Sequence, residues 1–199
     1  MRWIAALLII VLPSKSVDSP ADQEGVPSPY VVAVVNYNRS QSPCFYFKMS
    51  PNADSPLSWD DGYGAAYQVD VGEKDVLLWK TAGWYASRVF LAIDGQHLVR
   101  LGNWARGRTP NSDNLAIAFY ADGKLIKSYS ETDLIKDVSK AVATATHHSM
   151  WGRDPQRFIK FDGPIARRKD DTQFELTTVD GIHYVFSVSD GSVLSAEPK

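Results

Sequence analysis

The stretch LAIAFYADGKLIKSY, residues 115–129, decides the fold class of this chain. It holds two short apolar segments on either side of Asp122-Gly123. A two-residue hairpin turn needs positive φ, which Gly adopts freely and Asp tolerates, so Asp-Gly is typical of such turns. The stretch therefore predicts two antiparallel strands joined by a tight turn.

The same pattern recurs at Asp94-Gly95, Asp180-Gly181 and Asp190-Gly191, each flanked by apolar segments of strand length. Strands are expected at residues 30–37, 44–49, 75–81, 87–93, 97–101, 115–120, 124–129, 174–179, 182–187 and near 193, with a loop over 50–64. The predicted fold class is mostly β: an antiparallel β-meander in blade-like or sandwich-like sheets. The likeness of the hairpins is consistent with a repeated β unit, although a plain meander produces the same spacing.

One segment has helical rather than strand periodicity. Ser128 and Glu131 fit a capping box, in which Ser accepts from an amide of the first turn and Glu reaches back to the cap. Apolar residues then recur at helical spacing, at Leu134, Ile135, Val138, Ala141, Val142 and Ala145. The sequence therefore predicts one amphipathic helix over 131–146, packed on a sheet.

The first sixteen residues have the layout of a secretory signal peptide. Arg2 precedes an apolar run of about ten residues that ends at Pro13, and Ser14 and Ser16 give a small-x-small cleavage pattern. A membrane-spanning helix needs about 20 apolar residues, so this run is too short to be one.

The chain is therefore expected to consist of a signal peptide at 1–16, a flexible segment at 17–28 and a single β-rich domain at 29–199. The protein is expected to be exported, to the periplasm or beyond, with no transmembrane segment after cleavage. Cys44 is the only cysteine, so no intramolecular disulfide forms within the chain, and a buried thiol is expected there.

Charge narrows the choice of partner. Removal of residues 1–16 takes away Arg2 and Lys15 and no acidic residue, which moves the net charge from −2 to −4. A mildly acidic domain argues against nucleic acid or an anionic membrane surface as its main partner.

Several of these features together resemble a group of uncharacterised exported bacterial proteins whose hairpins look like β-propeller blade repeats. The matching residues are Leu78-Trp79, Asp94-Gly95, Asn103-Trp104, Asp122-Gly123-Lys124-Leu125, Asp133-Leu134 and Ser149-Met150-Trp151. The resemblance spans about half of the mature chain and implies an exported β-meander without assigning an activity. A mature chain of this length is too short for a closed ring of ordinary blades, so an incomplete, blade-like assembly is expected.

No motif in the chain carries a specific chemistry. Gly-x-Ser-x-Gly and G-x-G-x-x-G are absent, and Cys44 lacks a catalytic context. No catalytic residue and no cofactor is therefore predicted.

Two pairs of polar residues remain as candidates. Asp60-Asp61 in WDDGYG is expected to form a turn, and the alternative is a carboxylate centre for glycoside hydrolysis. His147-His148 are expected to cap a helix or lie on the surface, and the alternative is a metal site that includes one of them.

Tryptophans supply the candidate ligand contacts. Trp59, Trp84, Trp104 and Trp151 lie in or beside segments rich in Gly, Asn and Ser, where exposed rings offer flat apolar area to sugars or proteins. The alternative is that these rings fold back and close the ends of the sheets, and Trp79 is expected in the core.

The leading hypothesis is a non-catalytic exported binding or interaction protein of the bacterial envelope, with a protein or saccharide as partner. The second hypothesis is a carboxylate- or metal-dependent hydrolase. The third is a structural assembly subunit that buries its aromatic loops against another protein.

Overall fold

The computed structural model describes residues 27–34, 45–55, 61–70, 72, 74–103, 105, 107–143, 147–150 and 173–198. The predicted signal peptide at 1–16, most of the predicted flexible segment at 17–28, and Cys44 lie outside these ranges. Within the described ranges, no helix has both the length and the apolar character needed to span a membrane.

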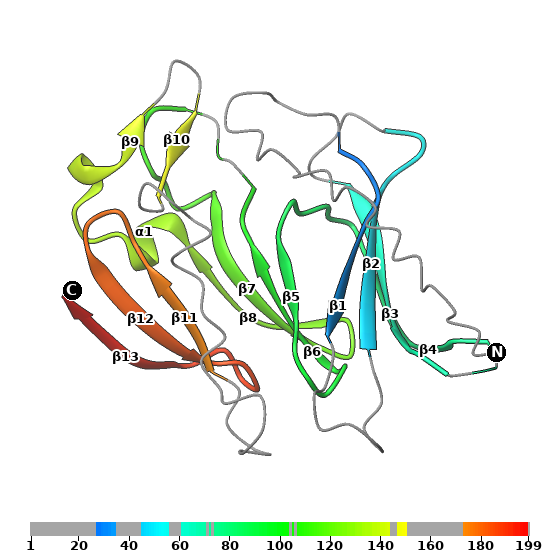
Figure 1. The fold of residues 1–199 in the computed structure, drawn as a ribbon. Coiled ribbons are helices and arrows are strands. Elements are labelled where there is room, and N and C mark those ends of the chain that lie inside the picture. The colour runs from blue at the N-terminus through cyan, green and yellow to red at the C-terminus, as the bar shows by residue number, and fades with distance from the viewer. Residues whose placement is uncertain are drawn as a thin grey trace, which may run out of the picture.

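The described residues form three main antiparallel sheets in which the strands follow chain order (Figure 1). The N-terminal sheet contains β1 (Tyr30–Val34), β2 (Phe45–Pro51), β3 (Gly62–Gln68) and β4 (Val76–Ala82). The central sheet contains β5 (Val89–Leu91), β6 (His97–Leu101), β7 (Leu115–Ala121) and β8 (Lys124–Ser130). The C-terminal sheet contains β11 (Gln173–Thr177), β12 (Ile182–Ser187) and β13 (Val193–Pro198), and β9 (Val142–Ala143) pairs with β10 (His148–Ser149). The prediction of a mostly-β, antiparallel meander is confirmed.

All four Asp-Gly pairs lie in turns between antiparallel neighbours, as predicted. At the β7–β8 turn, Asp122 has φ 48° and Gly123 has φ 77°. A Cβ on Gly123 would lie 2.2 Å from the carbonyl oxygen of Lys80, so glycine is required there both for its backbone conformation and for its size. This turn therefore packs closely against β4 of the N-terminal sheet.

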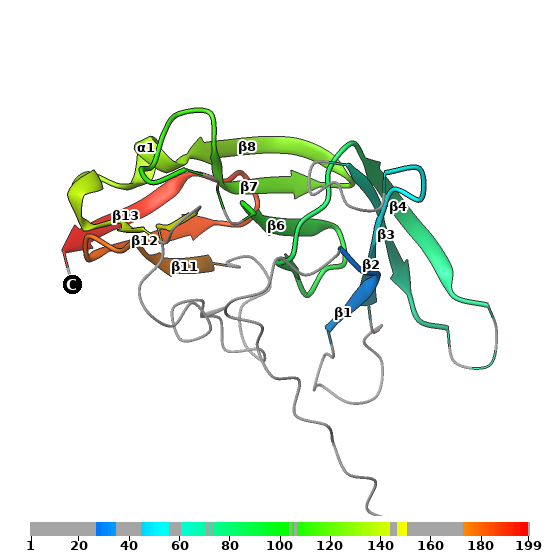
Figure 2. The same cartoon turned by 90° about the horizontal axis from the view of Figure 1, so that it is seen from above.

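The strand β7 in the central sheet is buried on both faces, whereas the edge strand β8 is largely exposed. Along β7, Ile117 and Phe119 belong to the core shared with the C-terminal sheet, whereas Ala118 and Tyr120 belong to the core shared with the N-terminal sheet. Figure 2 shows β11–β13 layered against β6–β8, with β1–β4 at the opposite end. The molecule is therefore a stack of three sheets with the central sheet in the middle.

Aromatic side chains fill both interfaces between the sheets. On the C-terminal side, the ring centroids of Phe119 and Phe186 lie 5.4 Å apart. On the N-terminal side, Trp84 and Tyr120 lie 5.3 Å apart, and Phe47 and Trp79 lie 5.4 Å apart. Trp79 is only 7% exposed, which confirms its predicted place in the core.

The structure corrects the predicted loop over 50–64. Strand β3 begins at Gly62 and continues to Gln68, paired with β2 on one side and β4 on the other. Gly, Ala and Gln have low strand propensity, so the local sequence gives little sign of this strand. Its place between two more apolar strands stabilises it instead.

The predicted helix over 131–146 is also wrong in extent. Helix α1 covers only Glu131–Leu134, and a 3₁₀ turn follows at Val138–Lys140. The capping box uses Ser130 and Asp133 rather than Ser128 and Glu131.

Asp180 explains why the helix stops. The backbone N–H groups of Lys136 and Asp137 donate to its Oδ2, at 2.7 and 3.0 Å. An α-helix would need the same N–H groups to donate to carbonyls four residues earlier. A carboxylate from the β11–β12 turn therefore replaces the helical hydrogen bonds and ends α1 after a single turn.

The stacking of the sheets predicts a large difference between two apolar truncations. Phe119→Ala empties a site that is 0% exposed, so we expect a loss of about 3–5 kcal/mol in the free energy of unfolding, measured in urea. Leu125→Ala on β8 changes a side chain that is 57% exposed, and should change it by no more than about 0.5 kcal/mol. Similar losses in the two variants would contradict the layered arrangement.

Asp180 predicts a pH dependence of stability. Burial alone would raise the pKa of this carboxyl, but hydrogen bonds from the Thr178 hydroxyl and from the N–H groups of Asp137 and Lys136 outweigh burial and hold the pKa below its ordinary value. Because the folded-state pKa is lowered, the stabilisation is present at neutral pH and is lost as the pH falls below about 4.

We therefore expect Asp180→Asn to lower the free energy of unfolding at pH 7 by on the order of 1 kcal/mol. The difference in free energy of unfolding between this variant and the unmodified chain should become smaller as the pH falls towards 3. A series of urea denaturations at decreasing pH measures it. Asp113→Asn, in an exposed loop, serves as the matched control and should follow the unmodified chain. A difference for Asp180→Asn that stays constant with pH would contradict the role given to the carboxylate.

Candidate binding face

The outer face of the N-terminal sheet is directed away from the core. Phe45, Phe47 and Met49 of β2 pack inward, so the alternate side chains of β2 and of its neighbours point outward. We call this outer surface the tyrosine face. Its side chains are Val31, Tyr46, Lys48, Tyr63, Ala65, Tyr67, Leu77, Lys80 and Ala82.

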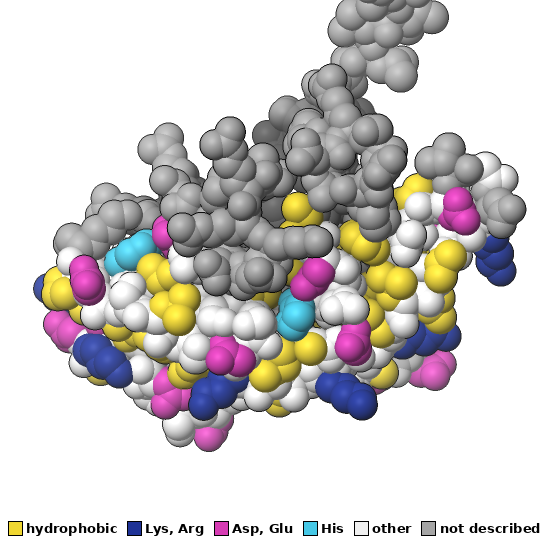
Figure 3. Space-filling view, turned by 90° about the horizontal axis from the view of Figure 1, so that it is seen from below, with side chains coloured by type: hydrophobic (Ala, Val, Ile, Leu, Met, Phe, Trp, Pro, Cys, Tyr) yellow, Lys and Arg dark blue, Asp and Glu magenta, His cyan; other side chains and the backbone are white. Residues whose placement is uncertain are grey.

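Large apolar and aromatic side chains of this face are open to solvent. Tyr63 is 55% exposed, Val31 is 56% exposed and Leu77 is 43% exposed. Figure 3 shows hydrophobic side chains at the surface over the end of the molecule that holds this sheet, with charged side chains beside them. An exposed aromatic surface of this kind is a common mark of a binding site.

Register places the side chains of the tyrosine face in rows across the strands. Lys48 pairs with Ala65, and Ala65 pairs with Lys80, so the two lysines lie on either side of a small residue. Tyr63 and Tyr67 lie on the same strand as Ala65, two residues before and two residues after it. A row of lysines therefore crosses a row of tyrosines at Ala65.

A shallow hollow of about 390 Å³ lies at this crossing. It is lined by Tyr63, Gly64, Ala65, Tyr67, Lys80, Thr81 and Ala82. Ala65 gives it a low floor and the two tyrosines rise on either side. Its volume falls within the range of small-ligand sites, about 300–1,000 Å³.

Glycine is required beneath the hollow. A Cβ on Gly64 would lie 2.1 Å from the ring of Phe47, which packs directly under β3. Because Gly64 has no side chain, β3 can lie directly on the Phe47 ring of the core. The core therefore supports the hollow from the inner side of the sheet.

Tyr67 stacks on a neighbour, Tyr46, that is itself held by a hydrogen bond. Its ring stacks on that of Tyr46, with centroids 4.9 Å apart and an angle of 16° between the planes. The Tyr46 hydroxyl donates to Asp75 at 2.8 Å, and this hydrogen bond is the main reason why the pKa of Tyr46 is raised. Tyr46 therefore stays neutral, and one wall of the hollow is ordered before any ligand arrives.

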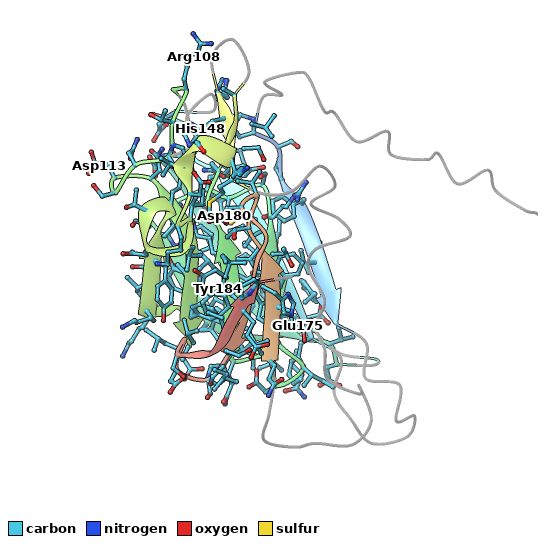
Figure 4. The ribbon with its side chains drawn as sticks, turned by 90° about the vertical axis from the view of Figure 1, so that its left-hand side faces the viewer. Arg108, Asp113, His148, Glu175, Asp180 and Tyr184 are labelled. Atoms are coloured by element: carbon cyan, nitrogen blue, oxygen red, sulfur yellow. The ribbon has the colours of Figure 1, made fainter. Side chains whose placement is uncertain are left out.

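Apart from the tyrosine face, a cluster of polar side chains surrounds the buried residue His148 at one end of the molecule (Figure 4). The Nε2 atom of His148 lies 2.9 Å from Oε2 of Glu131, the first residue of α1. The same Oε2 accepts from the backbone N–H of Asn111 and from the side-chain amide of Asn114, at 3.1 and 2.8 Å. The cluster thus ties α1 and β10 to the loop before β7.

Both ring nitrogens of His148 face oxygen acceptors. Nδ1 lies 3.1 Å from the carbonyl oxygen of Gly107, which can only accept, and Nε2 faces the Glu131 carboxylate. The contacts therefore place one proton on Nδ1 and a second proton between Nε2 and the carboxylate. His148 is 1% exposed and Glu131 is 2% exposed, so the protein encloses this pair and we assign it a role in the fold.

The structure corrects the position predicted for both histidines. His147 and His148 are 8% and 1% exposed, so neither lies on the surface. Among the described residues, no group of three or more His, Cys, Asp and Glu side chains is arranged to hold a metal ion.

The acidic pair is only half described. Asp60 lies outside the described ranges, and Asp61 accepts a hydrogen bond of 2.6 Å from the side-chain amide of Asn52. The Asp61 carboxylate thus links the residues before β3 to those after β2, and this hydrogen bond is not one within its own turn.

Of the four tryptophans predicted to contact a ligand, only Trp84 lies within the described ranges, and it is buried. Trp84 is 6% exposed, its indole N–H donates to the Thr81 hydroxyl at 3.1 Å, and the Arg100 guanidinium lies 4.6 Å from its ring centroid. Its ring is part of the core and does not provide the exposed surface that the ligand-binding prediction requires. Trp59, Trp104 and Trp151 lie outside the described ranges.

A third polar group lies on the outer face of the C-terminal sheet. The Thr177 hydroxyl lies 3.1 Å from Nδ1 of His183, and Nε2 of His183 lies 3.6 Å from the Glu175 carboxylate. The second distance is too long for a hydrogen bond, and Thr177 is 8% exposed. This group therefore does not offer an activated nucleophile to a substrate.

Sequence reasoning missed the tyrosines. Tyr63, Ala65 and Tyr67 alternate with small residues in GYGAAYQ, which is the spacing of side chains on one face of a strand. That alternation was the available signal, but the glycines and the nearby Asp60-Asp61 pair favoured a loop. Tyr46 and Lys48 show the same alternation in FYFKM.

Comparisons of the chain with protein-family models, with curated proteins and with solved structures give no match.

The buried pair of His148 and Glu131 predicts a strong effect of a conservative substitution. Glu131→Gln removes the carboxylate that contacts His148, Asn111 and Asn114, and we expect a loss of roughly 3–5 kcal/mol in the free energy of unfolding. Glu175→Gln, at the looser and more exposed pair with His183, is the matched control and should cost less than about 1 kcal/mol. Urea denaturation of both variants at pH 7 measures this difference, and equal losses would contradict the assignment.

Proposed function

We propose that this chain is an exported, non-catalytic binding protein of the bacterial envelope, and that its tyrosine face binds a saccharide chain. The observation that carries the proposal is the hollow over Ala65, walled by Tyr63 and Tyr67 on an open sheet face. Export remains an expectation from the first sixteen residues.

The chemistry of the hollow suits a sugar. The two faces of a sugar ring carry C–H groups that pack on aromatic rings, while its hydroxyls point outward to polar groups and water. Tyrosine provides both an apolar ring and a hydroxyl that stays hydrated at the rim. Lys80 lines the hollow beside them and can donate to ligand oxygens.

The size of the site favours a saccharide over a folded protein. A standard protein interface uses about 20–30 residues on each side. Among the described residues, nine outward side chains were assigned to the tyrosine face, and seven residues line its hollow. A ligand of a few sugar residues matches that extent better than a protein surface does.

The hydrolase hypothesis receives less support from the described residues. Asp61 is engaged by Asn52, and the His148–Glu131 pair is buried, so neither offers an acid or base to the tyrosine face. The hypothesis of an assembly subunit makes a different prediction, since it requires a protein partner on this face rather than a saccharide.

Substitutions of Tyr63 test the proposal directly. Tyr63→Ala removes one wall of the hollow, and we expect the affinity for a bound saccharide to fall by about threefold to tenfold. Tyr63→Phe keeps the ring and should retain most of the affinity. Isothermal titration calorimetry of the purified chain with a panel of neutral and acidic oligosaccharides gives the affinities.

Tyr63 is an exposed residue, so neither variant should change the free energy of unfolding by more than about 0.5 kcal/mol. Leu125→Ala, which removes an exposed side chain of the central sheet, is the matched control and should leave affinity unchanged. Failure of every oligosaccharide to bind, together with co-purification of a protein partner that is lost in Tyr63→Ala, would replace the saccharide proposal by the assembly hypothesis.

A further inference from the structure

We propose that the saccharide bound on the tyrosine face is acidic, and that Lys48 and Lys80 bind carboxylate groups on separate sugars of one chain. The inference rests on the proposed function of this face and names the class of its ligand: a short oligosaccharide that contains uronate sugars. The observation behind it is the row formed by Lys48, Ala65 and Lys80.

The two lysines are placed to contact one ligand together. They lie on β2 and β4 with β3 between them, so their backbones are two strand spacings apart, about 10 Å. Ala65 is the only side chain between them in this row. A single sugar ring does not extend across both strand spacings, whereas a chain of two or three sugars does.

The tyrosines define the path of that chain. Tyr63 and Tyr67 are four residues apart on β3, which separates their backbones by about 13 Å along the strand. A saccharide that lies along the lysine row therefore crosses β3 over Ala65 and passes between the two rings. Lys80 then meets the chain at the hollow, and Lys48 meets it on the other side of Ala65, on β2.

Both ammonium groups are available for an anionic ligand. Lys48 and Lys80 are exposed, and neither forms an ion pair with a described carboxylate. The acidic group beside this face, Asp75, already accepts from the Tyr46 hydroxyl at 2.8 Å and from the backbone N–H of Asp70 at 3.4 Å. The lysines are therefore the unpaired charges of the face.

The acidic character of the whole chain does not oppose a short acidic ligand. The net charge of the full sequence is −2, but exposed charges farther away than about 8 Å are largely screened at physiological ionic strength. The electrostatic attraction of a ligand with two or three carboxylates therefore depends mainly on Lys48 and Lys80, and little on the net charge of the chain. A nucleic acid carries a phosphate at every nucleotide and depends on a larger number of Lys and Arg contacts, so it fits this face less well.

Isothermal titration calorimetry with the purified chain tests the inference. The ligands are trimers of galacturonate and of mannuronate, and each is compared with its fully methyl-esterified counterpart. The ester keeps the sugar rings and removes the charge. We expect at least one free acid to bind about tenfold more tightly than its ester, because each carboxylate gains a charge-assisted hydrogen bond. The corresponding monosaccharide should bind much more weakly than the trimer, since it reaches only one lysine.

Three variants separate this effect from overall charge. Lys48→Gln and Lys80→Gln should each remove most of the preference for the acid over its ester. Lys140→Gln, in the 3₁₀ turn at Val138–Lys140, changes the net charge by the same amount away from the tyrosine face, and should retain that preference. Raising the salt concentration should weaken binding of the acid and leave binding of the ester unchanged.

The outcomes distinguish this inference from the function on which it rests. Equal affinities for acids and esters, both reduced by Tyr63→Ala, would overturn the acidic specificity and leave saccharide binding in place. No binding by these trimers or by any neutral oligosaccharide would overturn both. Tighter binding of a hexathymidylate oligonucleotide than of any acidic trimer, reduced by Tyr63→Ala, would assign the face to single-stranded nucleic acid instead.

Discussion

The fold depends on one constraint, which is that β7 is buried on both faces. Ile117 and Phe119 require one apolar sheet, and Ala118 and Tyr120 require another on the opposite side. The central sheet is therefore covered by the N-terminal sheet and the C-terminal sheet, and each of those covers it with only one face. The arrangement leaves an outer face at each end of the stack, and the surface chemistry of the protein is set by which side chains occupy these two faces.

The two outer faces differ in a way that points to function. Among the described residues, the outward side chains of the C-terminal sheet include Glu175, His183 and Glu197, which are polar or charged. On the N-terminal sheet, Tyr63 is exposed and the ring of Tyr67 stacks on that of Tyr46. The hollow lies between Tyr63 and Tyr67. Exposed rings contribute little to folding, since their apolar area stays in water. Their position on either side of Ala65 and beside two lysines is the observation on which the proposal of an acidic saccharide ligand rests.

The parts of the fold that follow from local chemistry could be predicted from sequence. Asp-Gly turns such as Asp122-Gly123 depend only on the backbone freedom of adjacent residues, and so the hairpins and the mostly-β class were predicted correctly. Features that depend on distant residues could not be predicted. The end of α1 depends on Asp180, which is 44 residues from Lys136, and the buried position of His148 depends on its contacts with Glu131 and the Gly107 carbonyl. The candidate site was missed because four of the seven residues of GYGAAYQ are Gly or Ala, which have low strand propensity, and because β3 is held in place by its neighbours β2 and β4.

The central claim is that a ligand chain lies across β3 between Tyr63 and Tyr67. The most direct test is a titration followed by nuclear magnetic resonance. An acidic trisaccharide that binds is added to the purified, isotope-labelled chain, and the chemical shifts of the backbone amides are recorded. The account predicts changes concentrated at Lys48, at residues 63–67 and at residues 80–82, with the C-terminal sheet unchanged. Changes concentrated on β11–β13 or around His148, with the amides of β3 unaffected, would contradict it.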